Sequence, residues 1–374
     1  MSGRLVHVLT VADSLVFIDA VVARARDDGW DVTVITSPDE RLTTFGRKLG
    51  VRTVGIEMPR KVTPLGDWRA LDALHTCFAR LKPDVVHAGT PKGGLLGTLA
   101  ARAAGVPVRI YQMRGLAYVT AKGVLRGVLS TTERLSCAAA TRVICQSHSL
   151  RAEAVSQGLV SADKSEVILG GSNGVDANRF APMSGAALRA KLGIPGSAQV
   201  VGFVGRLVRD KGVPELVEAF SQLKGAPHLI LAGPWEPRDP VSDDVRRLVE
   251  AHPRIHTPGF VADPREVYAA SDFVVLPSHR EGFPNVPLEA AAMERAVIST
   301  RIAGCIDAVS DGVTGTLVSV SDAAALAVAM QRYLDSPELA ARHGREGRQR
   351  VTRDFSRARI AEATVERYRA LTSI

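Results

Sequence analysis

The amino-acid sequence predicts a doubly wound α/β fold built as two similar halves. Strand-like apolar runs alternate with helical stretches along almost the whole chain, which is typical of parallel sheets covered by helices. The length of 374 residues suits two domains, and 46% hydrophobic residues can supply two sizeable cores. Residues 170–185 are rich in Gly, Asn and Pro, have the composition of a linker, and separate the two series of runs.

Short, continuous apolar runs bounded by turn residues mark the expected strands, because strands buried on both faces lose the alternation of half-exposed ones. The first half contains runs at residues 5–9, 32–35, 85–87, 108–111, 142–145 and 167–169. The second half contains runs at residues 200–204, 229–232, 273–276 and 297–299. Two such halves joined by a linker would face each other across a cleft.

The chain carries a net charge of +8 that is unevenly distributed. Residues 1–180 hold 23 Lys and Arg against 16 Asp and Glu, a surplus of 7, whereas the remainder holds 24 against 23. A surplus on one half suggests an anionic partner, such as nucleic acid, a membrane face or a phosphorylated substrate. The alternative is that scattered arginines only aid solubility. Aromatic residues make up 5% and do not alternate with the cations, which argues against nucleic acid.

The composition also predicts a location for the protein. No apolar run approaches the 18 or more residues of a membrane span, and Asp13 and Asp19 interrupt any signal-peptide core near the N-terminus. The cysteines lack the C-x-x-C spacing of metal sites, so a reduced, cytoplasmic protein is expected. These cysteines are Cys77, Cys137, Cys145 and Cys305.

Two glutamates, Glu281 and Glu289, follow the apolar run at 273–276, with seven residues between them. We expect Glu281 on the loop that leaves the strand and Glu289 in the first turn of a helix starting near Leu288. Ligands of open α/β sheets bind at the carboxyl ends of the strands, and carboxylates there suit sugar hydroxyls. The alternative is that Glu289 only complements the helix dipole and that Glu281 is a solvated loop charge.

A second cluster, GFVGRLVRDKG at residues 202–212, follows one expected strand and precedes a helix at 214–223. Arg206 and Lys211 lie there near a Gly-rich turn and a helix N-terminus, where cations can neutralise a leaving diphosphate. The segment lacks G-x-x-x-x-G-K-[ST] and is therefore no Walker A loop. The first turn of the chain, TVADSLVF, lacks G-x-G-x-x-G, which argues against a dinucleotide site there.

The arginine–lysine element followed by Glu-x7-Glu within PSHREGFPNVPLEA resembles the family 4 glycosyltransferases, which are retaining, use nucleotide sugars and have the GT-B fold of two Rossmann-like domains. The resemblance covers nearly the whole chain. It implies that Arg206 and Lys211 hold the donor diphosphate, Glu289 the ribose and Glu281 the donor sugar, without a metal or other cofactor. It also implies further donor-binding positions: Gly259, Phe260 and Val261 beside the base, and Phe283, Asn285 and Val286 near the paired glutamates.

The segment DVVHAGTPKGGLLG in the first half resembles the HxHTPKxG stretch of a bacterial subgroup that builds capsules, O-antigens and glycan repeats, with Gly89 in place of its second histidine. His87 would then lie near the reacting sugar, and His87, Glu281, Arg206 and Lys211 would form the catalytic set. Thr90 and Lys92 lead into a helix expected at 95–104, where an anion could bind. A lone histidine at a strand end is, however, usually structural.

Residues 113–130, MRGLAYVTAKGVLRGVLS, combine Arg114, Lys122 and Arg126 with apolar side chains. Such a loop and helix can rest on a membrane surface or place Arg114 against a lipid-linked diphosphate. The alternative is a packed helix whose cations extend to solvent. With Thr90 and Lys92, Arg114 completes the expected acceptor-binding set.

The sequence therefore predicts a retaining glycosyltransferase that moves an N-acetylhexosamine or hexose from a UDP-sugar to a polyprenyl-diphosphate-linked saccharide at the cytoplasmic face of the membrane. We expect an acceptor domain at 1–175, a donor domain at 176–355 and a terminal helix at 356–374 that crosses back to the first domain. Two other functions remain open: a UDP-sugar epimerase of the same fold, and a non-enzymatic binder of nucleic acid or an anionic surface.

Overall fold

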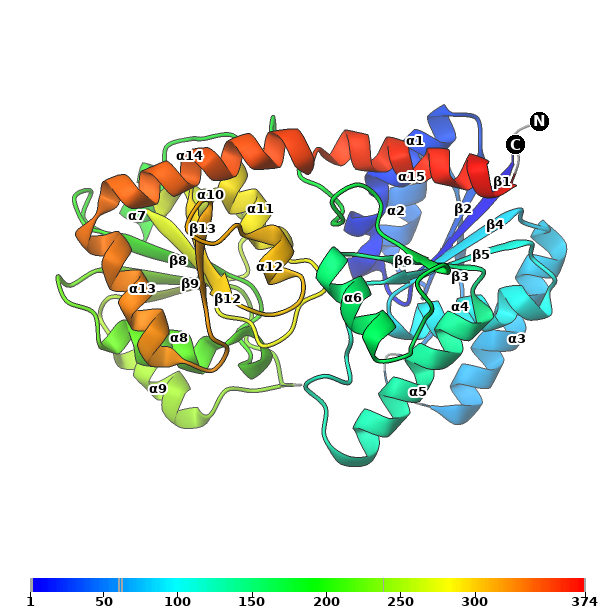
Figure 1. Cartoon of the computed structure of the whole chain (residues 1–374), viewed down its shortest axis with the longest axis horizontal. Coiled ribbons are helices and arrows are strands. Elements are labelled where there is room, and N and C mark those ends of the chain that lie inside the picture. Colours follow the sequence, from blue (N-terminus) through cyan, green and yellow to red (C-terminus); the bar gives the residue numbers. More distant parts are fainter. Residues whose placement is uncertain (1–2, 60, 62, 238, 373–374) are drawn as a thin grey trace. The chain divides into compact units, whose positions relative to one another are not determined.

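The computed structural model of the chain describes residues 3–59, 61, 63–237 and 239–372. It divides into two compact units, each with one parallel sheet covered by helices on both faces (Figure 1). Unit 1 comprises residues 1–173 and 357–374, and unit 2 comprises residues 174–356. The observed divisions therefore lie within two residues of the expected ones at 175 and 355. Residues 357–374 belong to the first unit.

The sheet of unit 1 has seven parallel strands in the order β3-β2-β1-β4-β5-β6-β7. Buried aliphatic side chains fill its central strands, as expected for a sheet covered on both faces. Its strands are β1 (Arg4–Val8), β2 (Asp31–Thr36), β3 (Arg52–Gly55), β4 (Val85–Gly89), β5 (Val108–Met113), β6 (Arg142–Cys145) and β7 (Ser165–Glu166).

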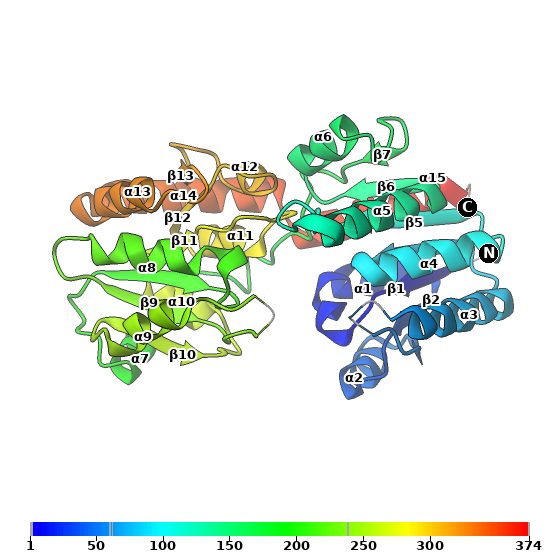
Figure 2. The same cartoon turned by 90° about the horizontal axis from the view of Figure 1, so that it is seen from below.

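Helices cover both faces of this sheet (Figure 2). On one face, α3 (Pro64–Leu81), α4 (Pro91–Ala103) and α5 (Gly123–Ala139) pack side by side. On the other, α1 (Asp19–Asp27) packs between α2 (Glu40–Leu49) and α15 (Arg357–Thr372). A 3₁₀ turn (Ala12–Phe17) precedes α1, and α6 (His148–Ser156) follows β6. Val365 and Tyr368 of α15 are fully buried in the core on the α1 face, so α15 is an integral part of unit 1.

The sheet of unit 2 has six parallel strands in the order β10-β9-β8-β11-β12-β13. These are β8 (Val200–Val204), β9 (His228–Ala232), β10 (Ile255–Gly259), β11 (Phe273–Leu276), β12 (Ala296–Thr300) and β13 (Gly315–Val318). The helices are α7 (Ala186–Lys191), α8 (Val213–Ser221), α9 (Asp243–Ala251), α10 (Arg265–Ala270), α11 (Asn285–Ala292), α12 (Cys305–Ala308), α13 (Ala323–Asp335) and α14 (Pro337–Asp354), with a 3₁₀ turn at Arg209–Lys211.

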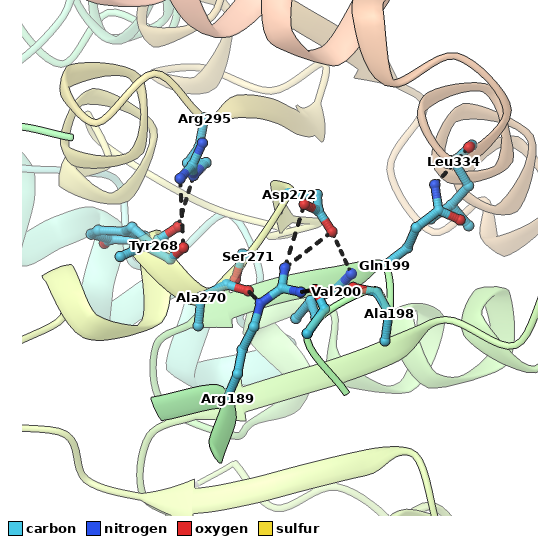
Figure 3. Close-up of polar contacts among 12 residues, drawn as sticks. Arg189, Ala198, Gln199, Val200, Tyr268, Ala270, Ser271, Asp272, Arg295 and Leu334 are labelled. Carbon is cyan, nitrogen blue, oxygen red and sulfur yellow. Dashed lines mark hydrogen bonds and ion pairs between the residues drawn. The ribbon is translucent and has the colours of Figure 1, made fainter. Parts of the chain in front are cut away.

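A polar network ties α7 to the amino ends of β8 and β11 (Figure 3). The Arg189 guanidinium donates to the carbonyl oxygens of Ala270 and Ala198 at 2.8 Å each and contacts the Asp272 carboxylate at 3.4 Å. Asp272 in turn accepts from the Val200 amide at 2.7 Å. Because these contacts lie at the amino ends of the strands, they hold the fold together at the end opposite to the usual ligand site.

The structure corrects several sequence-based expectations. The predicted strand at 167–169 is wrong: β7 ends at Glu166, and a turn follows in which Leu169 has φ of +49°. Strands β3, β10 and β13 were not predicted. Helix α4 begins at Pro91 and not at Leu95, and α11 begins at Asn285. Glu289 is consequently in the second turn of its helix, not the first.

Two further properties were also considered in the sequence analysis: membrane-spanning helices and the state of the cysteines. Within the described residues, no helix combines the length and apolar character that crossing a bilayer requires. All four cysteines are buried as free thiols.

Candidate active site

The order of the strands in unit 2 reverses between β8 and β11, which lie side by side at the centre of the sheet. Open α/β sheets bind ligands at the carboxyl ends of the strands at such a reversal, because the loops on either side diverge there and leave room. The loop after β8 carries Arg206 and Lys211, and the loop after β11 carries Glu281. The fold therefore brings three of the predicted residues to one point.

The two loops meet in an ion pair between Lys211 Nζ and Glu281 Oε1. Both side chains are largely buried, so water screens the pair weakly. Gly212, directly after Lys211, makes this approach possible. It has φ of +70°, and a Cβ atom there would lie 2.0 Å from the carbonyl oxygen of Pro277. A side chain at position 212 would therefore push the loops apart.

Acidic residues that the sequence analysis did not single out hold these loops in place. The Asp210 carboxylate accepts from Arg280 Nη2 at 2.7 Å, and the Asp210 carbonyl accepts from the His279 amide at 2.9 Å. The Asp210 amide donates to Asp239 Oδ2 at 2.6 Å, which adds the loop after β9. Glu215 Oε1 contacts His279 Nε2 at 2.8 Å. These acids carry no signal of their own in the sequence. Their roles become visible only when the loop that each one contacts is known.

Arg206 and Glu289 lie on either side of the Lys211–Glu281 pair in sequence and have separate partners. Arg206 is half-exposed and donates from Nη1 to Glu236 Oε2 at 3.0 Å. Glu289 Oε2 accepts from the hydroxyl of Tyr268 at 2.7 Å. Tyr268 is fully buried, and burial together with the Glu289 charge raises its pKa, so the phenol stays protonated and orients the carboxylate.

The remaining predicted donor residues differ in their surroundings. Gly259 ends β10 with φ of +74°, Phe260 is 78% exposed, and Val261 packs partly on the core. Phe283 is a buried core residue whose ring packs 5.3 Å from that of Phe355. Asn285 begins α11 and is followed by the partly buried Val286.

In unit 1, His87 is 6% exposed and both of its ring nitrogens have partners. Nε2 lies 3.1 Å from Gln112 Oε1, which can only accept, so Nε2 carries the proton. Nδ1 therefore accepts from the Tyr368 hydroxyl at 2.6 Å. Burial and the charge of Arg114 lower the His87 pKa to about 3. His87 is thus a neutral residue with a fixed tautomer.

Thr90 and Lys92 use their polar groups within unit 1. The Thr90 hydroxyl lies 2.7 Å from that of Thr10, and the Thr10 hydroxyl accepts from the Gly93 amide at 2.9 Å. Lys92 Nζ donates to Asp67 Oδ1 at 2.6 Å. The expected anion cradle at the start of α4 is therefore filled by protein groups in this structure.

Arg114, the third predicted acceptor residue, directly follows β5. Its Nη1 donates to Asn173 Oδ1 at 3.1 Å and to Gln146 Oε1 at 3.3 Å, and its guanidinium lies 5.0 Å from the centre of the Phe17 ring. Unlike Lys92, it contacts amide oxygens and a ring and no carboxylate among the residues that the structure describes.

Two family models match the chain, one in each unit. The model described as "Glycosyl transferase 4-like domain" matches residues 16–171, and the model described as "Glycosyl transferases group 1" matches residues 198–336. The second match contains Arg206, Lys211, Glu281 and Glu289.

Solved structures share the fold. Sucrose-phosphate synthase from Thermosynechococcus elongatus superposes with a TM-score of 0.85 at 24% identity over 99% of both chains. Anabaena HepE in complex with UDP-glucose superposes with a TM-score of 0.83 at 20% identity over 100% of both chains. At these identities the similarity establishes the architecture of two Rossmann-like domains, which is GT-B.

Curated relatives are similar in sequence as well. Alpha-maltose-1-phosphate synthase of Mycobacterium tuberculosis strain H37Rv is 35% identical over 213 residues, which is 53% of this chain and 55% of that protein. The capsular polysaccharide biosynthesis glycosyltransferase CapM of Staphylococcus aureus is 31% identical over 369 residues, which is 98% of this chain and 96% of that protein. This similarity spans both units and both family models, and the chain therefore belongs to the family 4 glycosyltransferases.

Proposed function

We propose that the protein is a retaining glycosyltransferase that moves a sugar, an N-acetylhexosamine or hexose, from a UDP-sugar to a lipid-linked saccharide in the assembly of a bacterial surface polysaccharide. The observation that carries the donor half of this proposal is the Lys211–Glu281 pair at the strand reversal of unit 2. Anabaena HepE, which has the same fold, was solved with UDP-glucose, and this supports a UDP-sugar donor.

In the proposed reaction, the bond between the anomeric carbon and the diphosphate oxygen breaks as the acceptor hydroxyl attacks from the same face. The acceptor proton passes to the departing phosphate oxygen, so no protein nucleophile is needed. Arg206 and Lys211 would neutralise the leaving diphosphate, Glu281 would bind sugar hydroxyls and Glu289 the ribose. Lys211 and Glu281 pair with each other in the ligand-free protein and would exchange that contact for the two ends of the donor.

The polysaccharide class rests on the whole-length similarity to CapM, and the acceptor class rests on the resemblance of the DVVHAGTPKGGLLG segment. Family membership also favours a transferase over the same-fold epimerase and over a binder without activity. In unit 1, Arg114 is the most available of the expected acceptor residues for an anion, because it pairs with no carboxylate among the described residues. Lys92, by contrast, pairs with Asp67, and the Thr90 hydroxyl bonds that of Thr10.

An exposed apolar surface on unit 1 supports a lipid-linked acceptor. All residues of the first two turns of α5, 123–128, are exposed, and Val124 is 85% exposed. At the start of α3, Leu65 and Trp68 are also exposed, Trp68 by 63%. Because α3 and α5 both pack on α4 and both follow parallel strands, their N-termini lie at the same end of the unit (Figure 2).

Cations surround these apolar side chains, with Lys122 and Arg126 exposed on α5 and Arg69 on α3. Apolar side chains that insert, ringed by cations that bind anionic lipid, are typical of peripheral membrane proteins. We therefore place the enzyme at the inner face of the cell membrane, where a polyprenyl-diphosphate carrier would be presented.

The experiment that tests the donor site is a thermal-shift titration with UDP, GDP, ADP and UDP-sugars. A ligand that binds only the folded state at a hundred-fold excess over its Kd stabilises it by about 2.7 kcal/mol. We expect UDP and one UDP-sugar to raise the midpoint, Lys211→Met to abolish the shift, and the exposed control Lys224→Met to keep it. The donor assignment is wrong if no nucleotide changes the midpoint at millimolar concentration.

Active protein then tests the reaction class. The transferred sugar should keep its anomeric configuration by NMR, and transfer should continue in EDTA. Inversion would contradict the retaining mechanism, and loss of transfer in EDTA that added divalent cations restore would contradict metal independence.

A further inference from the structure

Unit 1 contains a small polar cavity of about 40 Å³ at the carboxyl-terminal part of its central strands. His7 of β1 and His87 of β4 both line it. These two strands are neighbours at the reversal of strand order, and the two histidines are in register. Arg114 and Gln146 enter from the ends of β5 and β6, and Asn173 enters from the end of the first segment of unit 1. The cavity therefore occupies the position at which such sheets bind ligands.

The cavity contains a positive charge without an acidic partner. Among the residues that the structure describes, no carboxylate forms an ion pair with Arg114, whose contacts are two amide oxygens and the Phe17 ring. Burial lowers the Arg114 pKa to about 10, so the guanidinium remains charged at neutral pH. A buried charge is costly unless it is paired, and the described residues offer Arg114 neutral partners but no opposite charge.

Three polar atoms that line this cavity have no hydrogen-bond partner among the described residues: Arg114 Nε, Asn173 Nδ2 and His7 Nε2. Asn173 turns its oxygen to Arg114, which leaves its amino group as a free donor. His7 is 1% exposed, and burial followed by the charges of His87 and Arg114 lowers its pKa, so it is neutral. Buried polar groups are normally paired, and three unpaired ones at one cavity indicate a missing partner.

Two further polar side chains of the cavity, His87 and Gln112, are held through the terminal helix, and Arg357 of that helix is paired with Asp19. Tyr368 of α15 donates to His87, and His87 donates to Gln112, so these three side chains satisfy one another. The cavity thus presents unpaired donors and one uncompensated cation. An anion with several acceptor oxygens would compensate the cation and accept from these donors together.

We propose that this cavity binds the phosphoryl group of a substrate, with Arg114 as the charge partner, Asn173 as an additional donor, and His7 as a donor in the tautomer that protonates Nε2. A space of about 15 Å³ holds one water, so the cavity accommodates a group of phosphate size but no sugar ring. This inference rests on the proposed function only for the molecule that carries the phosphate, which is the acceptor or the donor. Binding of an anion at this site requires no transferase activity.

The first test is a thermal-shift titration with inorganic phosphate against sodium chloride at equal ionic strength. We expect a saturable rise of the midpoint for the wild type and none for Arg114→Met. General stabilisation by phosphate acts on both proteins alike, so their difference isolates the site. The matched control is Arg109→Met at the other end of β5, where the arginine donates to the carbonyl oxygens of Ala139 and Val106. This control should keep the phosphate response.

A second variant supplies the missing charge from within the protein. Asn173→Asp places a carboxylate against Arg114, so we expect a higher midpoint without phosphate and a phosphate affinity weakened at least tenfold. If Arg114 had only a structural role, Arg114→Met would lower the midpoint in phosphate-free buffer, and the wild type would show no saturable response to phosphate. Either an unsaturable wild-type response or an equal response in Arg114→Met would overturn the proposal.

The same titration separates this site from the donor site. Lys211→Met should lose its response to UDP and keep its response to phosphate. Arg114→Met should keep its full response to UDP if the site binds the acceptor's phosphate, and should show a weakened one if it binds a phosphate of the donor. If saturating UDP leaves the phosphate response intact, the site accepts the acceptor's phosphate; if UDP removes it, the site accepts a phosphate of the donor. A protein that binds phosphate through Arg114 but no nucleotide would leave this inference standing and refute the proposed donor.

Discussion

Glu133 illustrates how a single buried side chain in unit 1 couples stability to pH. It lies on α5, is almost fully buried and accepts a hydrogen bond from the Tyr111 hydroxyl at 2.7 Å. Burial raises its pKa to about 7, partly offset by that hydrogen bond. The folded protein therefore keeps this proton at pH values at which the unfolded chain has released it. The resulting stabilisation is present below pH 4.5 and is lost as the pH rises through 7.

We predict that Glu133→Gln stabilises the protein at alkaline pH. The amide keeps an oxygen for Tyr111 and cannot ionise, so the free energy of unfolding should rise by about 2–3 kcal/mol at about pH 8 and change little at about pH 4.5. Urea denaturation of both proteins at the two pH values measures this. The exposed control Glu250→Gln should stay within about 0.5 kcal/mol. An equal effect of Glu133→Gln at both pH values would show that packing, and not ionisation, is responsible.

Other buried groups titrate with the opposite sign. The pKa of His87 is lowered to about 3, so its contribution is present above pH 6.5 and is lost as the pH falls towards 3. The comparison between the wild type and the Glu133→Gln variant cancels this contribution, because both proteins contain His87.

At the scale of residues, the sequence could place Arg206, Lys211 and Glu281 on loops but not show which side chains meet. Their spacing follows from the motif, whereas the ion pair depends on β8 and β11 being neighbours. His7 and Asn173 went unnoticed for the same reason. A histidine inside an apolar run has no signal of its own, and only the register of β1 with β4 brings His7 beside His87.

At the scale of elements, the errors of prediction lie at the edges of the sheets. The strands that were missed or misplaced, β3, β7, β10 and β13, are the outermost strands of the two sheets. An edge strand has a neighbour on one side only and buries fewer side chains, so it lacks the continuous apolar run that marks a central strand. Arg52–Gly55, for example, contains no fully buried residue.

Helix α5 gives a test of the exposed apolar surface that we propose binds the membrane. We predict that Val124→Asp combined with Leu125→Asp weakens binding to vesicles of phosphatidylglycerol and phosphatidylethanolamine at least about tenfold, because inserting one valine contributes about 1.5 kcal/mol. Co-sedimentation with the vesicles measures this, with phosphatidylcholine vesicles for comparison. Leu135→Asp changes an exposed leucine farther along the same helix and serves as the control. Equal binding by all three proteins would rule out this surface.

At the scale of the whole molecule, the division into units predicts that the proposed donor site is independent of unit 1. Residues 174–356 contain both loops of the strand reversal and their own core. Expressed alone, this fragment should fold cooperatively and show a UDP-dependent thermal shift that Lys211→Met abolishes. A folded fragment without that shift would mean that unit 1 supplies essential donor contacts.

The position of α15 in unit 1 also constrains how the protein is made. Unit 2 is inserted in the sequence between β7 and α15, so the ribosome must synthesise it completely before the helix that fills the first core exists. Until then, the apolar faces that Val365 and Tyr368 will cover stay open, and His87 lacks the hydroxyl that fixes it. Unit 2 can therefore finish folding during synthesis before unit 1 does. The nascent chain depends most on chaperones while unit 1 still lacks α15.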